Sequence, residues 1–399
     1  MALVTRAVAG RSPAVSQSTI PVSGDAVAGL KPFDELLLQF MMQNSVPACS
    51  LAVGRKGRLV YARGFGFADA KQTQPATPES LFRIASVSKP ITSVAVLQLL
   101  QAGKISLDEP VLKYVKATVK DQRWQRVTIS HCLQHRSGMD RAKSGDPINK
   151  VPQIARDLNV PYPVSAEQVM RWSMGRPLDH DPGTMYAYSN IGYLILGRVI
   201  EVVSGQKYET YVKSAVLGPV DAKRMEIGHA LPSLRPTAEV SYFDRTRRMA
   251  PSLFPPNLGT YVPEVDDGMN IEGFEAHGGW IASAADLVRF AASFDGPEGP
   301  ILLNRETVAT MFERPVGEKN DEWYGCGWSV RTAGPNGAGM NTWHGGLLRP
   351  GTSALLVRRW DGLTWAVLFN TDINPKGEIL ADLIDRALHH AADAVTAWP

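Results

Sequence analysis

The chain has 399 residues, of which 44% are hydrophobic and 20% are charged, so it can bury a substantial core as an ordinary globular protein. Its formal net charge of +3 is too small to indicate a nucleic-acid partner. The three cysteines, Cys49, Cys132 and Cys326, lie far apart and are odd in number, which argues against a disulfide framework.

The N-terminal residues carry no targeting pattern. The first 30 residues contain no continuous apolar segment of signal-peptide length, and no later run is long enough to span a bilayer. We therefore expect no membrane span and, for the chain as it stands, a cytoplasmic location; removal of a leader would make a periplasmic or secreted location the expectation. Residues 1–30 are predicted to form a flexible arm, because residues 11–24 are rich in Ser, Pro and Val without periodicity.

A helix and a strand pair are predicted next. Apolar residues within 34–44 indicate a helix that ends before Pro47. The apolar runs 49–53 and 58–63 flank Gly54-Arg55-Lys56-Gly57, which is typical of a hairpin turn.

The following predicted helix, residues 86–102, carries the first motif, Ser86-Val87-Ser88-Lys89. On a helix Ser86 and Lys89 share one face, which places an ammonium beside a hydroxyl at the positive end of the helix dipole. Such a neighbour activates a weak nucleophile. The pattern is short, however, and its second copy, Ser204-Gly205-Gln206-Lys207, is interpreted as the end of a helix and a turn.

His131 and His135 have the four-residue spacing of a zinc pair on a predicted short helix. A zinc site of that type also needs a third ligand and a general-base glutamate, and Cys132 stands where the glutamate would be. Structural histidines are the favoured interpretation, and a metallohydrolase remains an alternative.

The rest of the chain predicts a mixed α/β (α+β) fold. Two proline-rich stretches, 140–163 and 251–270, are predicted to be long binding loops. Helices are predicted at 166–174, 191–204, from 282 through 290, and at 378–392, and strands at 323–331, 342–343, 353–359 and 363–370. Because helix and strand occur at both ends around a mostly helical middle, we expect an antiparallel sheet built from both chain ends. The predicted sheet domain comprises residues 31–110 and 280–399, the helical domain comprises residues 111–279, and the active site lies at their interface.

Two further motifs follow. Tyr188-Ser189-Asn190 precedes the helix predicted from residue 191, and alone it indicates a buried tyrosine and a helix-capping asparagine. His344-Gly345-Gly346 precedes Leu347 and is interpreted as a turn before the C-terminal strand pair. His277-Gly278-Gly279 and Lys143-Ser144-Gly145 are alternative matches to the same short pattern.

The order Ser86-x-x-Lys89, Tyr188-x-Asn190 and His344-x-Gly346 resembles the serine β-lactamase and penicillin-binding protein superfamily. Within it, the chain is most similar to the branch that holds class C β-lactamases, family VIII carboxylesterases, DD-peptidases and D-aminopeptidases. The similarity covers residues 33–391 and implies a β-lactamase-like fold. The supporting stretches are Leu107-Asp108-Glu109-Pro110, His135-Arg136-Ser137-Gly138-Met139, Pro182-Gly183, and residues 278–287.

The resemblance implies a role for each motif. Ser86 attacks a carbonyl to give an acyl-enzyme, and a positively charged Lys89 lowers the cost of removing its proton. Tyr188, with its phenol near ammonium groups, exchanges protons with Ser86 and then with the leaving group or attacking water. Asn190 positions the lysine and the substrate. Backbone N–H groups of Ser86 and Leu347 hold the oxyanion.

The same resemblance makes His344, Gly345, Gly346 and Leu347, together with Asn190, the expected substrate-binding residues, with no metal and no cofactor. Class C β-lactamases usually have a lysine where this chain has His344, and that lysine supplies a cation for the drug's carboxylate. The difference argues against strong β-lactamase activity.

We therefore expect a serine hydrolase of small-molecule esters or amides, of the family VIII carboxylesterase type, with weak β-lactamase activity as a secondary expectation. The alternatives are a β-lactamase, a D-amino-acid-specific peptidase or amidase, an acyltransferase, and a non-catalytic binding protein on the same fold. The sequence does not separate these activities, because they differ in pocket shape and water placement. The oligomeric state is not predicted either.

Overall fold

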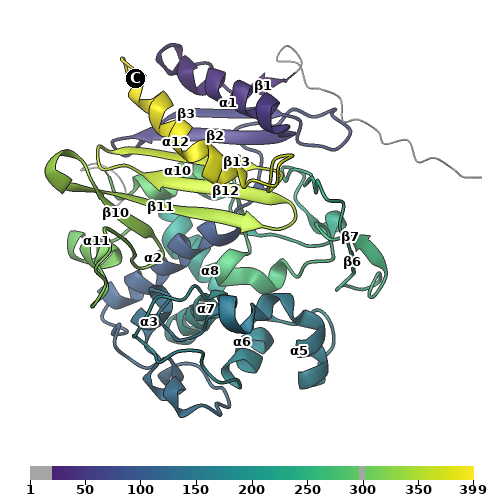
Figure 1. The fold of residues 1–399 in the computed structure, drawn as a ribbon, viewed down its shortest axis with the longest axis vertical. Coiled ribbons are helices and arrows are strands. Elements are labelled where there is room, and N and C mark those ends of the chain that lie inside the picture. The colour runs from purple at the N-terminus through teal and green to yellow at the C-terminus, as the bar shows by residue number, and fades with distance from the viewer. Residues whose placement is uncertain (1–19, 296–301) are drawn as a thin grey trace, which may run out of the picture.

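A computed structural model describes residues 20–295 and 302–399 as a sheet with helices on both faces (Figure 1). The sheet has eight strands in the order β1-β3-β2-β13-β12-β11-β10-β9, and all neighbours are antiparallel. Its strands are β1 (Val22–Ser23), β2 (Ala48–Arg55), β3 (Arg58–Gly66), β9 (Glu322–Tyr324), β10 (Ser329–Ala333), β11 (Gly339–Leu348), β12 (Thr352–Arg358) and β13 (Leu363–Phe369).

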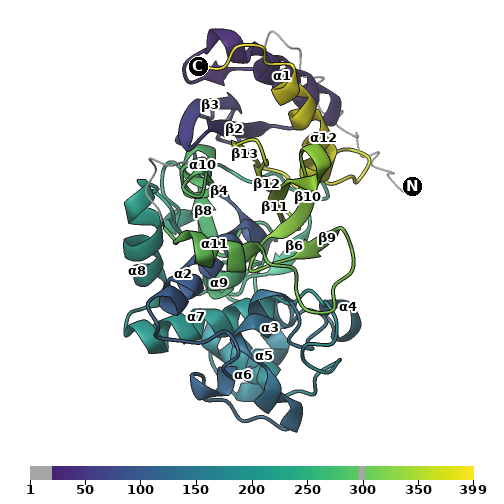
Figure 2. The same ribbon diagram turned by 90° about the vertical axis from the view of Figure 1, so that its left-hand side faces the viewer.

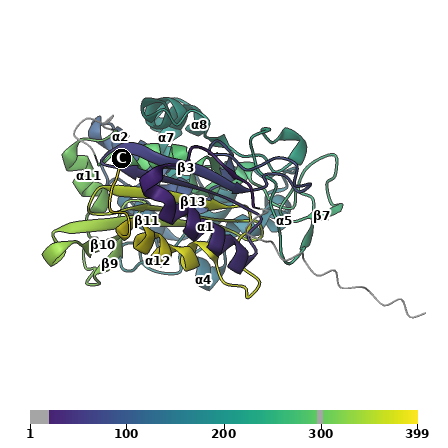
Figure 3. The same ribbon diagram turned by 90° about the horizontal axis from the view of Figure 1, so that it is seen from above.

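The two ends of the chain cover one face of the sheet. Helices α1 (Lys31–Asn44) and α12 (Leu380–Asp393) pack against each other there, as the view from above shows (Figure 3). In α1 the buried residues Phe33, Leu37, Phe40 and Met41 recur at helical spacing, so one apolar stripe faces the sheet. We call the apolar layer beneath these two helices the outer core.

The other face carries helix α10 (Ala284–Ala292) and, beyond it, the central helix α2 (Ser88–Gln101). Most residues of α2 are buried whichever way they point, which is expected of a helix that is apolar all round. Helix α7 (Asn190–Ser204) packs on α2 and on the short α9 (Glu275–Gly278). These helices belong to a second apolar layer, which we call the inner core.

The remaining elements lie around this centre, with α3 beside α7 and with α5 and α6 beneath it in the side view (Figure 2). The remaining α-helices are α3 (Ile129–Leu133), α4 (Arg141–Ser144), α5 (Val151–Leu158), α6 (Ala166–Met174), α8 (Tyr208–Val212) and α11 (Arg305–Phe312). Two small sheets pair β4 (Phe82–Arg83), β8 (Trp280–Ala282) and β5 (Glu226–Ile227), and β6 (Met249–Pro251) with β7 (Tyr261–Pro263).

The sheet built from both chain ends is confirmed, because β2 pairs with β13 from Cys49 opposite Phe369 to Arg55 opposite Leu363. The predicted hairpin after β2 and the helix at 166–174 are also present. The division into a sheet domain and a helical domain stays a prediction. Within the described ranges, no helix has the length and apolar character needed to cross a membrane.

Several predicted boundaries are wrong. The helix expected at 86–102 begins at Ser88, after a separate 3₁₀ turn at Ala85–Val87. The strand expected at 323–331 is divided into β9 and β10. The loop expected at 140–163 contains helices α4 and α5. Most of the predicted arm, residues 1–19, lies outside the described residues, whereas Val22–Ser23 pairs with β3 rather than being flexible.

Candidate active site

Ser86 lies in the 3₁₀ turn between strand β4 and helix α2. Its side chain is partly exposed, whereas Lys89, one turn later, is fully buried. Ala85, immediately before the serine, has a φ of 46°, in the left-handed region that residues with a Cβ rarely adopt. Strain of this kind persists where the surrounding structure enforces it, which is common at functional sites.

The Lys89 amine lies among three oxygen atoms. Its Nζ is 3.1 Å from Ser86 Oγ, 2.7 Å from Asn190 Oδ1 and 2.9 Å from the backbone oxygen of His277. The amide and carbonyl oxygens can only accept, so a neutral amine can donate both hydrogens to them and point its lone pair at Ser86. Burial lowers the pKa of Lys89 well below its usual value, against the opposing charge of Asp146, and so favours that neutral form.

Tyr188 completes the contacts of the serine. Its hydroxyl donates a 2.8 Å hydrogen bond to Ser86 Oγ. Burial raises the pKa of Tyr188, although the hydrogen bond to Ser86 and the charge of Arg141 lower it in part. The cationic environment expected from the sequence is thus outweighed, and the resting group is a phenol.

Asn190 links Lys89 to a residue that the sequence analysis missed. Its Oδ1 accepts from Lys89, and its Nδ2 donates to Asp146 Oδ2 at 2.6 Å. A carboxylate can only accept, so Asp146 fixes which end of the Asn190 amide faces the lysine. The only sequence signal for Asp146 is its place in the 140–163 stretch, where we expected binding residues.

The third motif lies within strand β11, not in the turn predicted from its glycines. Strand β10 pairs with β11 only as far as Trp343, so residues 344–348 have a partner strand, β12, on one side alone. The chain leading into the Ser86 turn lies over one face of this segment: a Cβ on Gly346 would lie 2.2 Å from the Ile84 oxygen and 3.2 Å from the Cβ of Ala354 on the paired strand. Gly345 has open space around it, and Leu347 is exposed.

His344 is held by other groups. Its Nδ1 is 2.7 Å from the Gly345 oxygen, and its Nε2 is 2.9 Å from the hydroxyl of Tyr324. Since a carbonyl only accepts, Nδ1 carries the hydrogen and Nε2 accepts from Tyr324. Burial lowers the pKa of His344 to about 3. The side chain is therefore neutral and supplies no cation for a substrate carboxylate.

His135 belongs to an aromatic cluster beside the serine. Its ring centroid is 4.2 Å from that of Tyr188 and 4.5 Å from that of Tyr324, and its Nδ1 accepts the N–H of Ser189. His131 Nδ1 instead accepts the N–H of Thr128 at the start of α3. Both histidines thus have structural partners, and no group of three potential metal-binding His, Cys, Asp or Glu residues occurs in the part of the chain that the structure describes.

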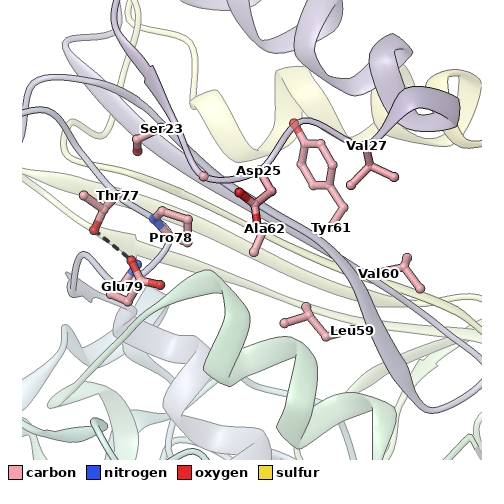
Figure 4. Close-up of a pocket in the computed structure, with 11 residues that line it drawn as sticks. Ser23, Asp25, Val27, Leu59, Val60, Tyr61, Ala62, Thr77, Pro78 and Glu79 are labelled. Carbon is pink, nitrogen blue, oxygen red and sulfur yellow. Dashed lines mark hydrogen bonds between the residues drawn. The ribbon is translucent and has the colours of Figure 1, made fainter. Parts of the chain in front are cut away.

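Two hollows in the structure differ in whether they share residues with the groups around Ser86. One of about 220 Å³ adjoins these groups and is lined by Arg136, Tyr186, Pro315, Glu318, Asn320, Glu322, Trp323, Tyr324 and Ser329. A larger one, of about 540 Å³, lies along β3, where Ser23, Asp25, Tyr61 and Glu79 surround it (Figure 4). No residue that lines either hollow contacts Ser86, but the smaller hollow shares Tyr324 with His135 and His344. The candidate site is therefore centred on Ser86, with the smaller hollow as its neighbour.

Similarity to known proteins extends over most of the chain. A family model described as Beta-lactamase matches residues 33–389. The chain is 28% identical over 189 residues to Protein flp of Staphylococcus aureus, a match that covers 47% of this chain and 36% of that protein, so it spans about a third of that curated relative. It is 25% identical over 345 residues to a protein of Escherichia coli named "Putative D-alanyl-D-alanine carboxypeptidase", covering 81% of this chain and 76% of that one.

Solved structures share the fold. The penicillin-binding protein of Bacillus halodurans has a TM-score of 0.68 at 20% identity, with 89% of this chain and 98% of that chain covered. The D-amino acid amidase of Ochrobactrum anthropi has a TM-score of 0.67 at 20% identity, with 92% and 97% covered.

Proposed function

Since the chain belongs to the Beta-lactamase family of serine β-lactamases and penicillin-binding proteins, we propose that it hydrolyses small ester substrates through an acyl-Ser86 intermediate, as a carboxylesterase. The observation that carries the proposal is the pair of contacts on one reachable hydroxyl: Lys89 Nζ and Tyr188 OH both lie within 3.1 Å of Ser86 Oγ. A nucleophile flanked by a buried amine and a phenol has a proton acceptor and a proton donor in place.

Acylation begins when the Lys89 amine takes the proton of Ser86 as Oγ attacks the carbonyl carbon. The hydroxyl of Tyr188 then gives its proton to the leaving oxygen, and the proton held by Lys89 restores the phenol. Asn190 and the His277 oxygen keep the amine in place throughout. The bond between carbonyl carbon and leaving group breaks, and an ester to Ser86 remains.

Deacylation reverses these transfers with water as the nucleophile. Water loses a proton to the Tyr188 and Lys89 pair, and Ser86 recovers its own when the acid leaves. We assign the oxyanion site to the backbone N–H groups of Ser86 and Leu347. The approach of β11 to the Ser86 turn at Gly346 supports that assignment.

A D-amino-acid amidase or peptidase is the second candidate, supported by the amidase fold and by the carboxypeptidase-named relative. Strong β-lactamase activity is less well supported. A β-lactam's carboxylate calls for a cation at the position of His344, whereas this imidazole is neutral and its Nε2 accepts a hydrogen bond from Tyr324. A non-catalytic binding protein would keep the fold without turnover.

The test is intact-protein mass spectrometry after brief incubation with p-nitrophenyl butyrate, a D-amino acid amide, a penicillin and a cephalosporin. We expect a butyryl adduct or p-nitrophenol release that is lost in Ser86→Ala and unaffected by a chelator. Ser204→Ala is the matched control, because Ser204 begins the second Ser-x-x-Lys copy and its Oγ only caps the N–H of Gln206. Equal reaction by Ser86→Ala would refute the proposal, and a chelator-sensitive reaction would indicate a metallohydrolase.

A further inference from the structure

We propose that Arg141 is a specificity-determining residue that binds a carboxylate on the leaving group of the substrate. This inference rests on the proposed function, because it concerns what the acyl-serine site accepts. Sequence analysis did not single out Arg141, which begins the short helix α4.

The guanidinium of Arg141 lies against Tyr188, one of the proposed catalytic residues. Its central carbon is 4.2 Å from the centroid of the Tyr188 ring, the distance of a cation stacked on an aromatic face. The Tyr188 hydroxyl in turn touches Ser86, so a single tyrosine ring separates the guanidinium from the nucleophile. The side chain is nevertheless exposed and can be reached by a ligand.

No carboxylate of the described residues pairs with this guanidinium within 4 Å. The neighbouring acidic groups have other partners: Asp140 contacts His180, Asp179 accepts from Ser144 and the Asp140 N–H, and Asp146 accepts from Asn190. The N–H groups of this exposed guanidinium are therefore available to a planar carboxylate from the substrate.

The other cationic residues around Ser86 are unsuited to this task. Lys89 is fully buried and surrounded by its three oxygen partners. His344 is neutral. Arg136 is paired with Glu318 and also donates to the backbone oxygens of Gly183 and Val316.

The position of Arg141 also indicates which part of the substrate carries the carboxylate, the leaving group or the acyl chain. In the proposed mechanism the leaving group takes its proton from the Tyr188 hydroxyl, so it lies against the tyrosine that Arg141 covers. A carboxylate on the leaving group is then within reach of the guanidinium. A carboxylate at the far end of the acyl chain is not expected to be favoured.

A matched pair of acetate esters tests the inference: 4-acetoxybenzoate, whose leaving group is anionic, and its neutral methyl ester. For the purified full chain we expect the ratio of kcat/KM, anionic over neutral, to fall by about tenfold in Arg141→Gln, which is the scale of one charge-assisted hydrogen bond. The fall should come mainly from KM of the anionic ester. Added salt should lower the ratio of the wild type and not that of the variant.

Lys143→Gln is the matched control, because it removes an exposed positive charge two residues away whose Nζ bonds only the backbone oxygen of Asp179. Its ratio should equal that of the wild type, and Arg141→Lys should give an intermediate ratio. An unchanged ratio in Arg141→Gln would overturn the inference. The inference would also be overturned if Arg141→Gln lowered the ratio only for substrates that carry the carboxylate on the acyl side. The matched pair for this measurement is the p-nitrophenyl esters of adipic acid and of its monomethyl ester.

Failure of the proposed function gives a different result. In that case the neutral methyl ester shows no turnover that depends on Ser86, whatever residue stands at position 141. Ser86-dependent turnover of the neutral ester with a ratio insensitive to Arg141 would leave the proposed function intact and remove only the role of the arginine.

Discussion

Burial sets the protonation states of the side chains that touch or face Ser86. It lowers the pKa of Lys89 and of His344 and raises that of Tyr188, so that an amine, a neutral imidazole and a phenol are favoured. For Lys89 the charge of Asp146 acts in the opposite direction, so burial decides the protonation state of the amine. The site is therefore prepared to move protons without first creating a buried charge.

The pH dependence of turnover follows from Lys89. Because only the neutral amine can accept the Ser86 proton, kcat for p-nitrophenyl butyrate should fall as pH falls through the lowered pKa of Lys89. No basic limb from Tyr188 is expected below about pH 9.5, since its pKa is raised above the ordinary value of 10. A stopped assay across this range checks both statements, and a basic limb near neutrality would indicate a phenolate base instead.

Replacing Tyr188 by phenylalanine should slow acylation by about 10²- to 10⁴-fold, because it removes the proton donor to the leaving group. Single-turnover kinetics with p-nitrophenyl butyrate measures this step directly. Tyr186→Phe is the comparison, since that exposed tyrosine makes no hydrogen bond to Ser86. Full acylation rate in Tyr188→Phe would remove the phenol from the mechanism.

His344 should make the fold sensitive to acid. Its folded-state pKa of about 3 lies below the ordinary 6.5, so between these values the unfolded chain binds a proton that the native protein does not. Relative to His344→Gln, the wild type should lose up to about 1.4 kcal/mol of unfolding free energy per pH unit as pH falls below about 6.5. Urea unfolding of both proteins at several pH values between 7.5 and 4.5 tests this, and parallel stability curves would contradict it.

Little of this protonation chemistry could be predicted from the sequence. The order of the motifs indicated Ser86, Lys89, Tyr188 and Asn190, and the structure brings these four side chains into contact. The partners of the motif residues come from segments without a recognisable pattern, such as Asp146 in a proline-rich stretch. Burial is a property of the assembled protein, so the neutral state of the third-motif histidine could not be deduced from local sequence.

Among the elements, the contact between β11 and the Ser86 turn determines the shape of the site. A methyl group at Gly346 would meet the Ile84 oxygen, so Gly346→Ala must displace either the strand or the turn. We expect a loss of about 1–3 kcal/mol in stability, from overpacking. Gly345→Ala, which meets no atom within 4 Å, should leave the melting temperature almost unchanged. Thermal unfolding of the two variants separates them, and equal melting temperatures would contradict the close approach.

The elements that the sequence predicted well are those with strong periodicity or a short turn, such as α6 and the hairpin after β2. The errors occur where tertiary contact overrides a local preference. Glycines are disfavoured in strands, so His344-Gly345-Gly346 resembled a turn, yet Gly346 is needed because the backbone of Ile84 is so near. In the same way, periodicity alone extends one helix back to Ser86, whereas residues 85–87 form a separate 3₁₀ turn that begins at the left-handed Ala85.

At the scale of the whole molecule, the sheet separates the inner core, which supports the site, from the outer core, which does not contact it. The inner core surrounds α2 and α7, which carry Lys89 and Asn190, whereas the outer core lies beneath α1 and α12. Changes in the outer core should therefore alter stability more than chemistry.

Ile384→Ala, in the buried face of α12, should cost about 2–5 kcal/mol of stability through the cavity it leaves. Its kcat/KM for p-nitrophenyl butyrate, measured well below the unfolding temperature, should stay within about twofold of the wild type, because the sheet stands between this position and Ser86. The neighbouring Leu383 is exposed, and Leu383→Ala should cost under about 1 kcal/mol. Urea titration and steady-state kinetics measure both effects, and a large loss of kcat/KM in folded Ile384→Ala would show that the layers are coupled.

The pairing of β2 with β13 has a consequence for biosynthesis. These strands are neighbours in the sheet although β2 ends at Arg55 and β13 begins at Leu363. A ribosome synthesises the chain from its N-terminus, so β2 and β3 remain an incomplete sheet until residues 363–369 have been made. During that interval their hydrogen-bonding edge is open to other chains. The nascent protein should thus depend on protection from aggregation. The contacts around Ser86 should form only after strands β11 to β13 have been synthesised.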